Sequence, residues 1–320
     1  MSTDGVAHLL TYLGVPRAAA REYVSRGVWL PVSWALAVLL FSISLAGVRA
    51  VWPRVEAALP GSWLWNTYYV TVTVNVGTQV LCNILLLPFY LSGVLDGVKS
   101  ERGRAWPWAG GKDERIRFWN AIYKSAWLVP FNMLFVSLVG LIGIAPIVRF
   151  LNIETSFAVQ DLPSMQTVLV HLLFCLLVED AMFFCSHRLL HTDFLYKNVH
   201  KTHHDYLHVA GPASEHAHPL EFTLGNLLPV ITGPLLCRAH ASTMCLFLAL
   251  RIAVSVEEHS GFSCRASPLR VSPWAALSAG HAYHHSHTTN VFASQFVFWD
   301  ALFGTDANFN AWLEGGGKKL

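Results

Sequence analysis

Charged side chains are scarce in this sequence. Only 13% of its 320 residues are Asp, Glu, Lys or Arg, whereas 53% are hydrophobic and the mean hydropathy is +0.42. Soluble domains carry about a quarter charged residues, so the composition indicates an integral membrane protein. The formal net charge is only +2, and no basic patch has interleaved aromatic residues, so we expect no binding of nucleic acid.

The sequence also lacks the usual signatures of bound redox cofactors. None of its six cysteines forms a C-x-x-C pair, and there is no C-x-x-C-H haem motif or G-x-G-x-x-G nucleotide loop. We expect the cysteines to be small buried side chains rather than disulfides. Any redox chemistry must therefore receive its electrons from outside the chain.

Long hydrophobic runs are abundant instead. Residues 28–48 form an uncharged run that is long enough to cross a bilayer, and too long for a typical signal peptide, so we expect a retained span. Three more runs follow at 67–96, 126–148 and 168–185. The stretch 222–250 is broken by prolines and glycine, and the sequence leaves open whether it is a re-entrant hairpin or two spans.

The distribution of charge predicts the topology. The loop 93–124 carries seven Lys and Arg residues against a smaller number of acids, and the positive-inside rule places such a loop in the cytosol. Counting spans from there puts residues 1–27 in the cytosol and the loop 149–165 in the lumen. The fourth span then returns the chain to the cytosol, so we expect a multi-pass protein.

Eight histidines follow the fourth run in three short motifs. The first is H-x-x-x-H and the other two are H-x-x-H-H: His187 and His191; His200, His203 and His204; His281, His284 and His285. Residues three and four apart share one helix face, so each motif can direct two or three imidazoles at one point. Neutral imidazole suits iron, zinc, copper and nickel, but a zinc ion takes only four ligands. Two iron ions therefore match this set best, on the cytosolic side.

Other polar residues near these motifs are candidates for orienting the ligand imidazoles. Asp180 is seven residues before His187, which places it on nearly the same helix face. The alternative is a polar residue at a helix end that faces lipid headgroups. The same orienting role, or simple solvation, is open for five further residues: Glu215, His216, Glu221, Glu258 and His287.

The three motifs, in this order and spacing, resemble those of the fatty acid hydroxylase superfamily, which includes the sterol desaturase family. Longer strings are most similar to sterol C4-methyl oxidases, or methylsterol monooxygenases. Residues 214–222 resemble their E-x-A-H-P-L-E, 258–262 their T-H-S-G-Y, and 284–305 their H-H-S-H and Y-W-D-x-L-F-G-T strings. Glu258 replaces the usual threonine, and Ala282 departs from the third motif; these changes bear on the substrate more than on the metal.

This resemblance implies an all-α fold, an integral membrane helical bundle with a cytosolic helical cap that holds a histidine-rich di-iron site. It covers about residues 165–306, which would form the catalytic domain. The cytosolic segment 1–27, the transmembrane part 28–164 and the tail 307–320 would lie outside it.

The resemblance also extends the ligand set to His218 and His259, which match further histidines of the family. Both lie where apolar chain meets the expected cap, and an ionisable group at that depth is a candidate for a functional role.

The function that the resemblance implies is oxidation of the C4-methyl group of sterol precursors in the endoplasmic reticulum membrane. It would use O2 and two Fe ions, with cytochrome b5 and its NAD(P)H-dependent reductase as electron donors. A hydroxylase or desaturase of fatty-acyl chains, sphingolipids or other sterols is the alternative on the same scaffold. A metal transporter is disfavoured, because transporters place their ligands near the bilayer midplane, whereas these motifs lie among charged residues.

Overall fold

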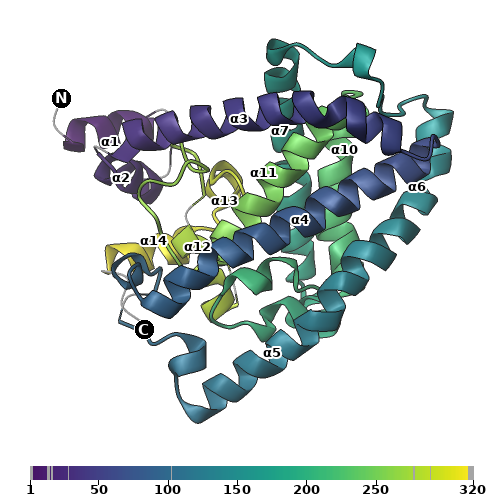
Figure 1. Cartoon of the computed structure of the whole chain (residues 1–320). Coiled ribbons are helices and arrows are strands. Elements are labelled where there is room, and N and C mark those ends of the chain that lie inside the picture. The colour runs from purple at the N-terminus through teal and green to yellow at the C-terminus, as the bar shows by residue number, and fades with distance from the viewer. Residues whose placement is uncertain are drawn as a thin grey trace.

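A computed structural model gives the fold of the chain (Figure 1). It describes residues 3–12, 15, 17–27, 29–101, 103–276, 278–288 and 290–315. Within these residues the regular secondary structure is helical, and β-structure is limited to two isolated β-bridges. The predicted all-α class is confirmed.

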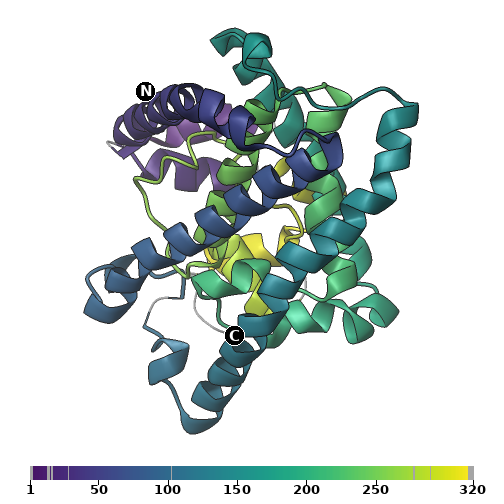
Figure 2. The same cartoon turned by 45° about the vertical axis from the view of Figure 1, so that its right-hand side comes forward.

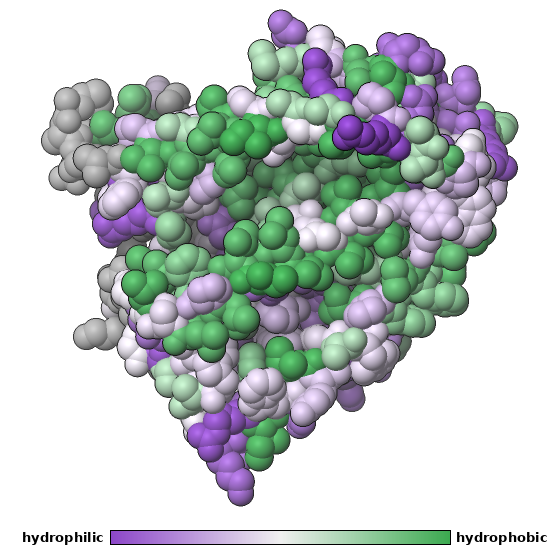
Figure 3. Space-filling view, in the orientation of Figure 1, coloured by the Kyte–Doolittle hydropathy of each residue, from purple (hydrophilic) through white to green (hydrophobic). Residues whose placement is uncertain are grey.

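Four helices are long and apolar enough to cross a membrane. They are α3 (Trp29–Ala58), α4 (Trp63–Ser92), the continuous helix Lys112–Phe150 and α7 (Met165–Leu190). Each contains most of one predicted hydrophobic run. The outer faces of α3 and α4 expose many large apolar side chains, and Figure 3 shows this hydrophobic surface between hydrophilic groups at the bottom and at the upper right. Such a surface suits contact with lipid rather than water.

The third of these helices contains a wider turn in its middle. It consists of α5 (Lys112–Pro130), the π-helical segment η3 (Phe131–Val136) and α6 (Ser137–Phe150). Segments of π-helix often mark functional places. Here the wide turn directs the buried side chain of Asn132 inward, where its Nδ2 donates to the carbonyl oxygen of Ala217 at 2.7 Å. The helix is thereby tied to the loop that follows the second histidine motif.

The interrupted stretch 222–250 forms part of a helical hairpin. The first arm comprises α9 (Pro219–Glu221), the π-helical η7 (Phe222–Leu227) and α10 (Leu228–Leu236), and the second arm is α11 (Ala241–His259). The turn between them meets the loop before α7, which contains η4 (Val159–Asp161), since the Ala241 amide donates to Ser156 at 2.9 Å. The two arms run along α7 and α4, respectively.

Close packing of the first arm depends on one glycine. A Cβ atom at Gly233 in α10 would lie 2.8 Å from the Cα atom of Cys175 in α7. Real Cβ atoms do not approach backbone this closely, so α10 packs against α7 only because residue 233 has no side chain. The six cysteines are all free. Cys175 and Cys245 are buried as expected, but Cys185 and Cys264 are exposed, so the expectation of buried side chains is wrong for these two.

The remaining elements gather at the opposite end from the hairpin turn (Figure 2). They are α1 (Thr3–Tyr12), α2 (Arg17–Ser25), η1 (Asp96–Val98), η2 (Pro107–Ala109), α8 (Asp193–Asn198), η5 (His200–Asp205), η6 (Gly211–Glu215), α12 (Ser278–His287), α13 (Phe298–Phe303) and α14 (Ala307–Glu314). Lys124 pairs with Asp205 at 2.7 Å and the Ser100 amide donates to Gly261 at 2.8 Å. The basic loop and the histidine motifs thus share one end, as the charge-based topology requires.

Candidate metal centre

The first two histidine motifs are adjacent along the chain and differ in local structure. His187 lies in the last turn of α7 and His191 follows as its C-cap, with ring centroids 5.2 Å apart. The second motif forms a 3₁₀ helix, η5, rather than an α-helix. Residues i and i+3 eclipse each other in a 3₁₀ helix, so His200 and His203 lie on one side with ring centroids 5.4 Å apart.

The third motif lies on α12, where His281, His284 and His285 are all buried. This helix packs against the end of α11, which brings His259 to the same place. The Nε2 atoms of His281 and His259 are 2.8 Å apart. Four segments of the chain therefore converge on a single buried region.

The imidazoles form two groups of four. Within each group, the candidate ligand atoms all lie within 4.8 Å of one another. The first group is His187, His191, His200 and His284, and the second group is His203, His259, His281 and His285. The second and third motifs each contribute to both groups, so neither group belongs to one segment.

His204 lies between the two groups. Its Nε2 is 3.2 Å from the Nε2 of His200, and its ring centroid is 5.0 Å from that of His284 and 4.7 Å from that of His285. Among the described residues its Nδ1 has no hydrogen-bond partner.

The other ring nitrogen of most ligands is held by a backbone carbonyl oxygen. Nδ1 of His187, His203, His259, His284 and His285 lies 2.6–3.0 Å from the carbonyl oxygens of Phe292, His216, Ser255, Asn290 and Tyr206, respectively. A carbonyl oxygen only accepts, so each Nδ1 must donate its proton. Each Nε2 then carries a lone pair, which is the pattern of metal-binding histidines.

The distances between neighbouring Nε2 atoms show whether a metal ion fits between the imidazoles. The Nε2 atoms of His187 and His284 are 3.1 Å apart, and those of His203 and His259 are 3.3 Å apart. Unprotonated nitrogens at such distances present lone pairs to each other, which is unfavourable without a cation between them. Two clusters of four neutral imidazoles fit two transition-metal ions of the iron, copper or zinc type.

Burial keeps these imidazoles neutral. It lowers the pKa of His203 to about 4, and together with the neighbouring His203 it lowers the pKa of His259 to about 3. Neutral imidazole is the form that binds metal. Protons therefore do not compete for these nitrogens near neutral pH.

One ligand is oriented by a carboxylate instead of a carbonyl. Glu221 Oε1 lies 2.8 Å from Nδ1 of His200, and both side chains are buried. Burial raises the pKa of Glu221 well above its ordinary value. Of the acids that were candidates for orienting a ligand imidazole, Glu221 is the one that contacts such an imidazole directly.

Asp180 does not contact a candidate ligand imidazole directly but holds a backbone loop near one. Its Oδ1 accepts from the amides of Gln295 and Phe296 at 2.7 and 3.3 Å. The loop so held carries the Phe292 carbonyl, the acceptor for His187. Asp300, which sequence reasoning did not single out, accepts from the Phe292 amide at 2.8 Å. A carboxylate that acts through a loop cannot be recognised by its spacing from a histidine.

Four other predicted residues lie around the groups. Glu215 has Asn226 as its side-chain partner, and Glu258 accepts from Ser294 at 3.2 Å. His216 supplies the carbonyl for His203, while its ring lies 2.8 Å from Ser125 Oγ. His287 lies 3.0 Å from the Tyr283 carbonyl within its own helix.

The structure places His218 outside both groups. It is the N-cap of α9, where its Nδ1 accepts from the Leu220 amide at 3.2 Å. His218 therefore caps a helix and does not join the candidate ligands to which the resemblance assigns it.

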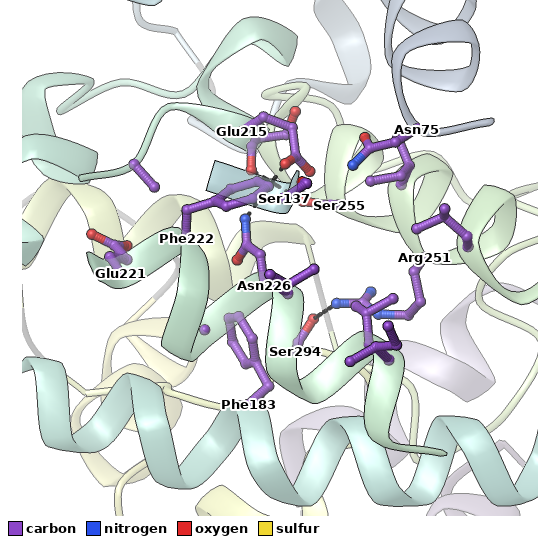
Figure 4. A pocket seen from close by; sticks show the side chains of 18 of the residues that line it. Asn75, Ser137, Phe183, Glu215, Glu221, Phe222, Asn226, Arg251, Ser255 and Ser294 are labelled. Carbon is purple, nitrogen blue, oxygen red and sulfur yellow. Dashed lines mark hydrogen bonds between the residues drawn. The ribbon is translucent and has the colours of Figure 1, made fainter. Parts of the chain in front are cut away.

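A cavity of about 1210 Å³, counted with the open space at its mouth, adjoins the histidines. Its wall runs from His187, His203 and His281 to apolar residues such as Leu141 and Met244. Figure 4 shows polar side chains projecting into it from several elements, among them Glu215, Asn226 and Arg251. Its wall is mostly apolar away from the histidines, which suits a lipid ligand.

Sequence reasoning did not single out Arg251. It is the one charged residue in the apolar segment 241–256, and it pairs with the buried Glu179 at 2.7 Å. An ionisable residue within a hydrophobic run is a signal that would have found it.

Comparison with known proteins agrees with the motifs. Residues 172–305 match the family model described as fatty acid hydroxylase. The matched segment contains the three histidine motifs. No solved structure matches the chain.

Several curated proteins are similar to this chain. The chain is 36% identical over 179 residues to methylsterol monooxygenase 2-1 of Arabidopsis thaliana, covering 51% of this chain and 64% of that protein. It is 36% identical over 167 residues to the very-long-chain aldehyde decarbonylase GL1-11 of Oryza sativa subsp. japonica, covering 51% and 61%. It is 34% identical over 258 residues to the fatty acid hydroxylase ahd1 of Mycosarcoma maydis, covering 78% and 62%. The chain thus spans less than two thirds of the length of each relative.

Proposed function

We propose that this protein is a membrane-bound non-haem di-iron oxygenase that oxidises the C4-methyl group of sterol precursors. Its oxidant is O2, and its electrons come from cytochrome b5 and an NAD(P)H-dependent reductase. The observation that carries this proposal is the convergence of eight Nε2 atoms in two groups beside a cavity with a mostly apolar wall. The match to the fatty acid hydroxylase model and the methylsterol monooxygenases among its relatives support it.

In this proposal each group of four histidines holds one iron. His204 lies between the two groups and is available to either ion. Bound iron would supply the reduction of O2 and the removal of hydrogen from an unactivated C–H bond, which side chains do not attack.

The chain's own residues perform the binding and the orientation. Backbone carbonyls and Glu221 hold the Nδ1 protons, which fixes each ring with its Nε2 toward the ion. Burial of the histidines excludes water from the reacting carbon. The apolar part of the cavity holds the rigid body of the sterol, which gains by leaving water.

We further propose residence in the endoplasmic reticulum membrane with the histidines at its cytosolic face. The shared end of the basic loop and the histidine motifs supports this orientation, since Lys124 pairs directly with Asp205, the residue after the second motif. The electron donor would then approach from that end.

A second candidate is oxidation of a fatty-acyl chain or sphingolipid. The relative that matches the largest part of this chain among the three, 78%, is named a fatty acid hydroxylase. The helical scaffold and the histidine groups would serve either substrate.

A paired substrate assay tests the proposal. Membranes containing the protein, with cytochrome b5, its reductase and NADPH, receive either a 4,4-dimethylsterol or a long-chain acyl lipid, and the products are measured by mass spectrometry. We expect O2-dependent oxidation of the sterol, abolished in His203→Ala and retained in His8→Ala, which changes an exposed residue of α1. Turnover of the acyl lipid alone would transfer the assignment to the second candidate.

A further inference from the structure

The cavity is surrounded by more charge than a hydrocarbon ligand requires. Glu179, Glu215 and Glu258 are at most 4% exposed, and Arg251 is 6% exposed. Two of the acids have cationic partners, because Glu179 pairs with Arg251 at 2.7 Å and Glu258 with Arg270 at 3.5 Å. Glu215 is the buried acid of this set that has no ion pair among the described residues.

Glu215 retains hydrogen-bonding capacity. Within the described part of the chain, the partner of its carboxylate is Asn226, whose Nδ2 lies 3.5 Å from Oε2. This distance is at the outer limit of a hydrogen bond, and Oε1 is left for another donor. Burial raises the pKa of Glu215 to about 7, although the charge of Arg251 partly offsets the effect.

Glu215 lies at the histidine end of the cavity. It precedes His216, whose carbonyl oxygen holds Nδ1 of His203 at 3.0 Å. The carbonyl oxygen of Ser214, on its other side, is 3.5 Å from the hydroxyl of Ser255, and the Ser255 carbonyl holds His259. An atom bound to Glu215 therefore lies close to the second group of histidines.

Arg251 supplies donors on another part of the same wall. Its Nε and Nη1 are buried and have no hydrogen-bond partner among the described residues. Its Nη2 is within 3.4 Å of Ser294 Oγ. In Figure 4, Glu215 and Asn226 lie near each other, and Arg251 projects into the same cavity from a third element on the right.

We propose that Glu215, Asn226 and Arg251 form a subsite that binds the hydroxyl group of an alcohol lipid and thereby selects the carbon that faces the histidines. The inference rests on the proposed function, because it concerns the substrate of the same site. A hydroxyl group donates one proton and accepts at its lone pairs, so it can donate to Glu215 and accept from Asn226 or Arg251. A carboxylate cannot donate to Glu215, and it would add negative charge where three acids already face two arginines.

Binding of ligands that cannot be oxidised tests this subsite independently of turnover. The protein as purified, with its metal, is kept free of O2 in lipid nanodiscs and titrated with a saturated sterol alcohol, its methyl ether and a long-chain free fatty acid. A hydroxyl bonded to a charged group contributes a ten- to hundredfold difference in affinity, on the order expected for charge-assisted hydrogen bonds. We expect the alcohol to bind at least tenfold more tightly than the ether, which has no proton to donate.

Variants at Glu215 and Asn226 test whether these residues cause the preference. Glu215→Met removes both oxygens at similar volume and should remove the preference for the alcohol while leaving affinity for the ether unchanged. Glu215→Gln should lie between Met and wild type. Glu154→Gln, at an exposed acid that pairs with Arg149, should behave as wild type, and thermal unfolding of all variants identifies any that fail to fold. Asn226→Leu provides a second route to the same loss.

The outcomes separate the subsite from the proposed function. Equal affinity for alcohol and ether in the wild type, or an unchanged preference in both Glu215→Met and Asn226→Leu, would overturn the subsite, while oxidation of a 4,4-dimethylsterol would leave the function intact. Tighter binding of the fatty acid than of the alcohol would overturn the subsite and favour an acyl substrate.

Discussion

Glu221 Oε1 lies 2.8 Å from Nδ1 of His200, where carbonyl oxygens serve five of the other ligands. A carboxylate that accepts from an imidazole makes the ring a stronger electron donor and fixes its direction. His200 belongs to the first group of histidines. The contact therefore links one acid to the first group of histidines.

Replacement of this acid should weaken metal binding. Glu221→Ala should lower the affinity of the first site by about 10- to 100-fold, as for other partners of metal ligands. Glu221→Gln keeps an acceptor oxygen and should lose less. Metal titration followed by elemental analysis measures the difference, and Glu154→Ala at the surface is the control. Full iron retention in Glu221→Ala would show that the contact has no such role.

The metal content itself is the next prediction. The purified protein should hold about two irons per chain, because eight convergent imidazoles exceed what one ion takes. His203→Ala should empty the second site and still insert into the membrane, whereas His8→Ala should retain both ions. Elemental analysis that finds one zinc and no iron would contradict the di-iron assignment.

Asp180 should affect the first site selectively. Asp180→Ala frees the amides of Gln295 and Phe296 and loosens the loop that carries the acceptor for His187. We expect loss of iron from the first group before the second, since carbonyls of the second group belong to other segments. Mössbauer spectra of the reconstituted variant distinguish the sites. Equal loss from both sites would argue for a general folding defect.

Stability of the metal-free protein should fall in acid. The folded-state pKa values of His203, about 4, and His259, about 3, lie below the ordinary 6.5. The unfolded chain therefore binds protons first as the pH falls below 6.5, and each group removes about 1.4 kcal/mol per pH unit until its folded pKa is reached. Thermal unfolding at pH 8, 6.5, 5.5 and 4.5 should show little change above 6.5 and a steep decline below. A flat profile would contradict the neutral, buried state.

The sequence was sufficient to predict some of this structure and insufficient for the rest. The histidine motifs and hydrophobic runs are local patterns, so the all-α class, the four long helices and the candidate ligands could be read directly. The division of ligands between two groups could not, because His203 joins His259 and His281 only through packing of α11 and α12. The role of Asp180 depends on a loop more than a hundred residues away. The resemblance alone predicts that His218 is a ligand, but the structure shows it capping α9 through the nearby Leu220 amide.

Alanine substitutions at two glycines distinguish the cost of lost close packing from the gain in helix propensity. Gly233→Ala places a Cβ atom 2.8 Å from the Cα of Cys175, and such overpacking costs about 1–3 kcal/mol. Gly143→Ala in α6 has no atom within 4 Å of its new Cβ, so it should be neutral or slightly stabilising in a helix. Unfolding temperatures in detergent compare the two. Equal melting temperatures would show that α10 can move away from α7 without loss.

The length of the helix Lys112–Phe150 bears on how deep the candidate metal centre lies relative to the membrane surface. At 1.5 Å per residue its 39 residues extend roughly 58 Å, about twice the hydrocarbon thickness of a bilayer. The charged part before Ser125 must then emerge from the lipid, with Lys124 at the boundary. Ser125 Oγ is 2.8 Å from the hydroxyl of Tyr206, whose carbonyl holds His285. The ions would thus lie level with the membrane surface, where a lipid arrives by sideways diffusion within its own leaflet and never has to enter water.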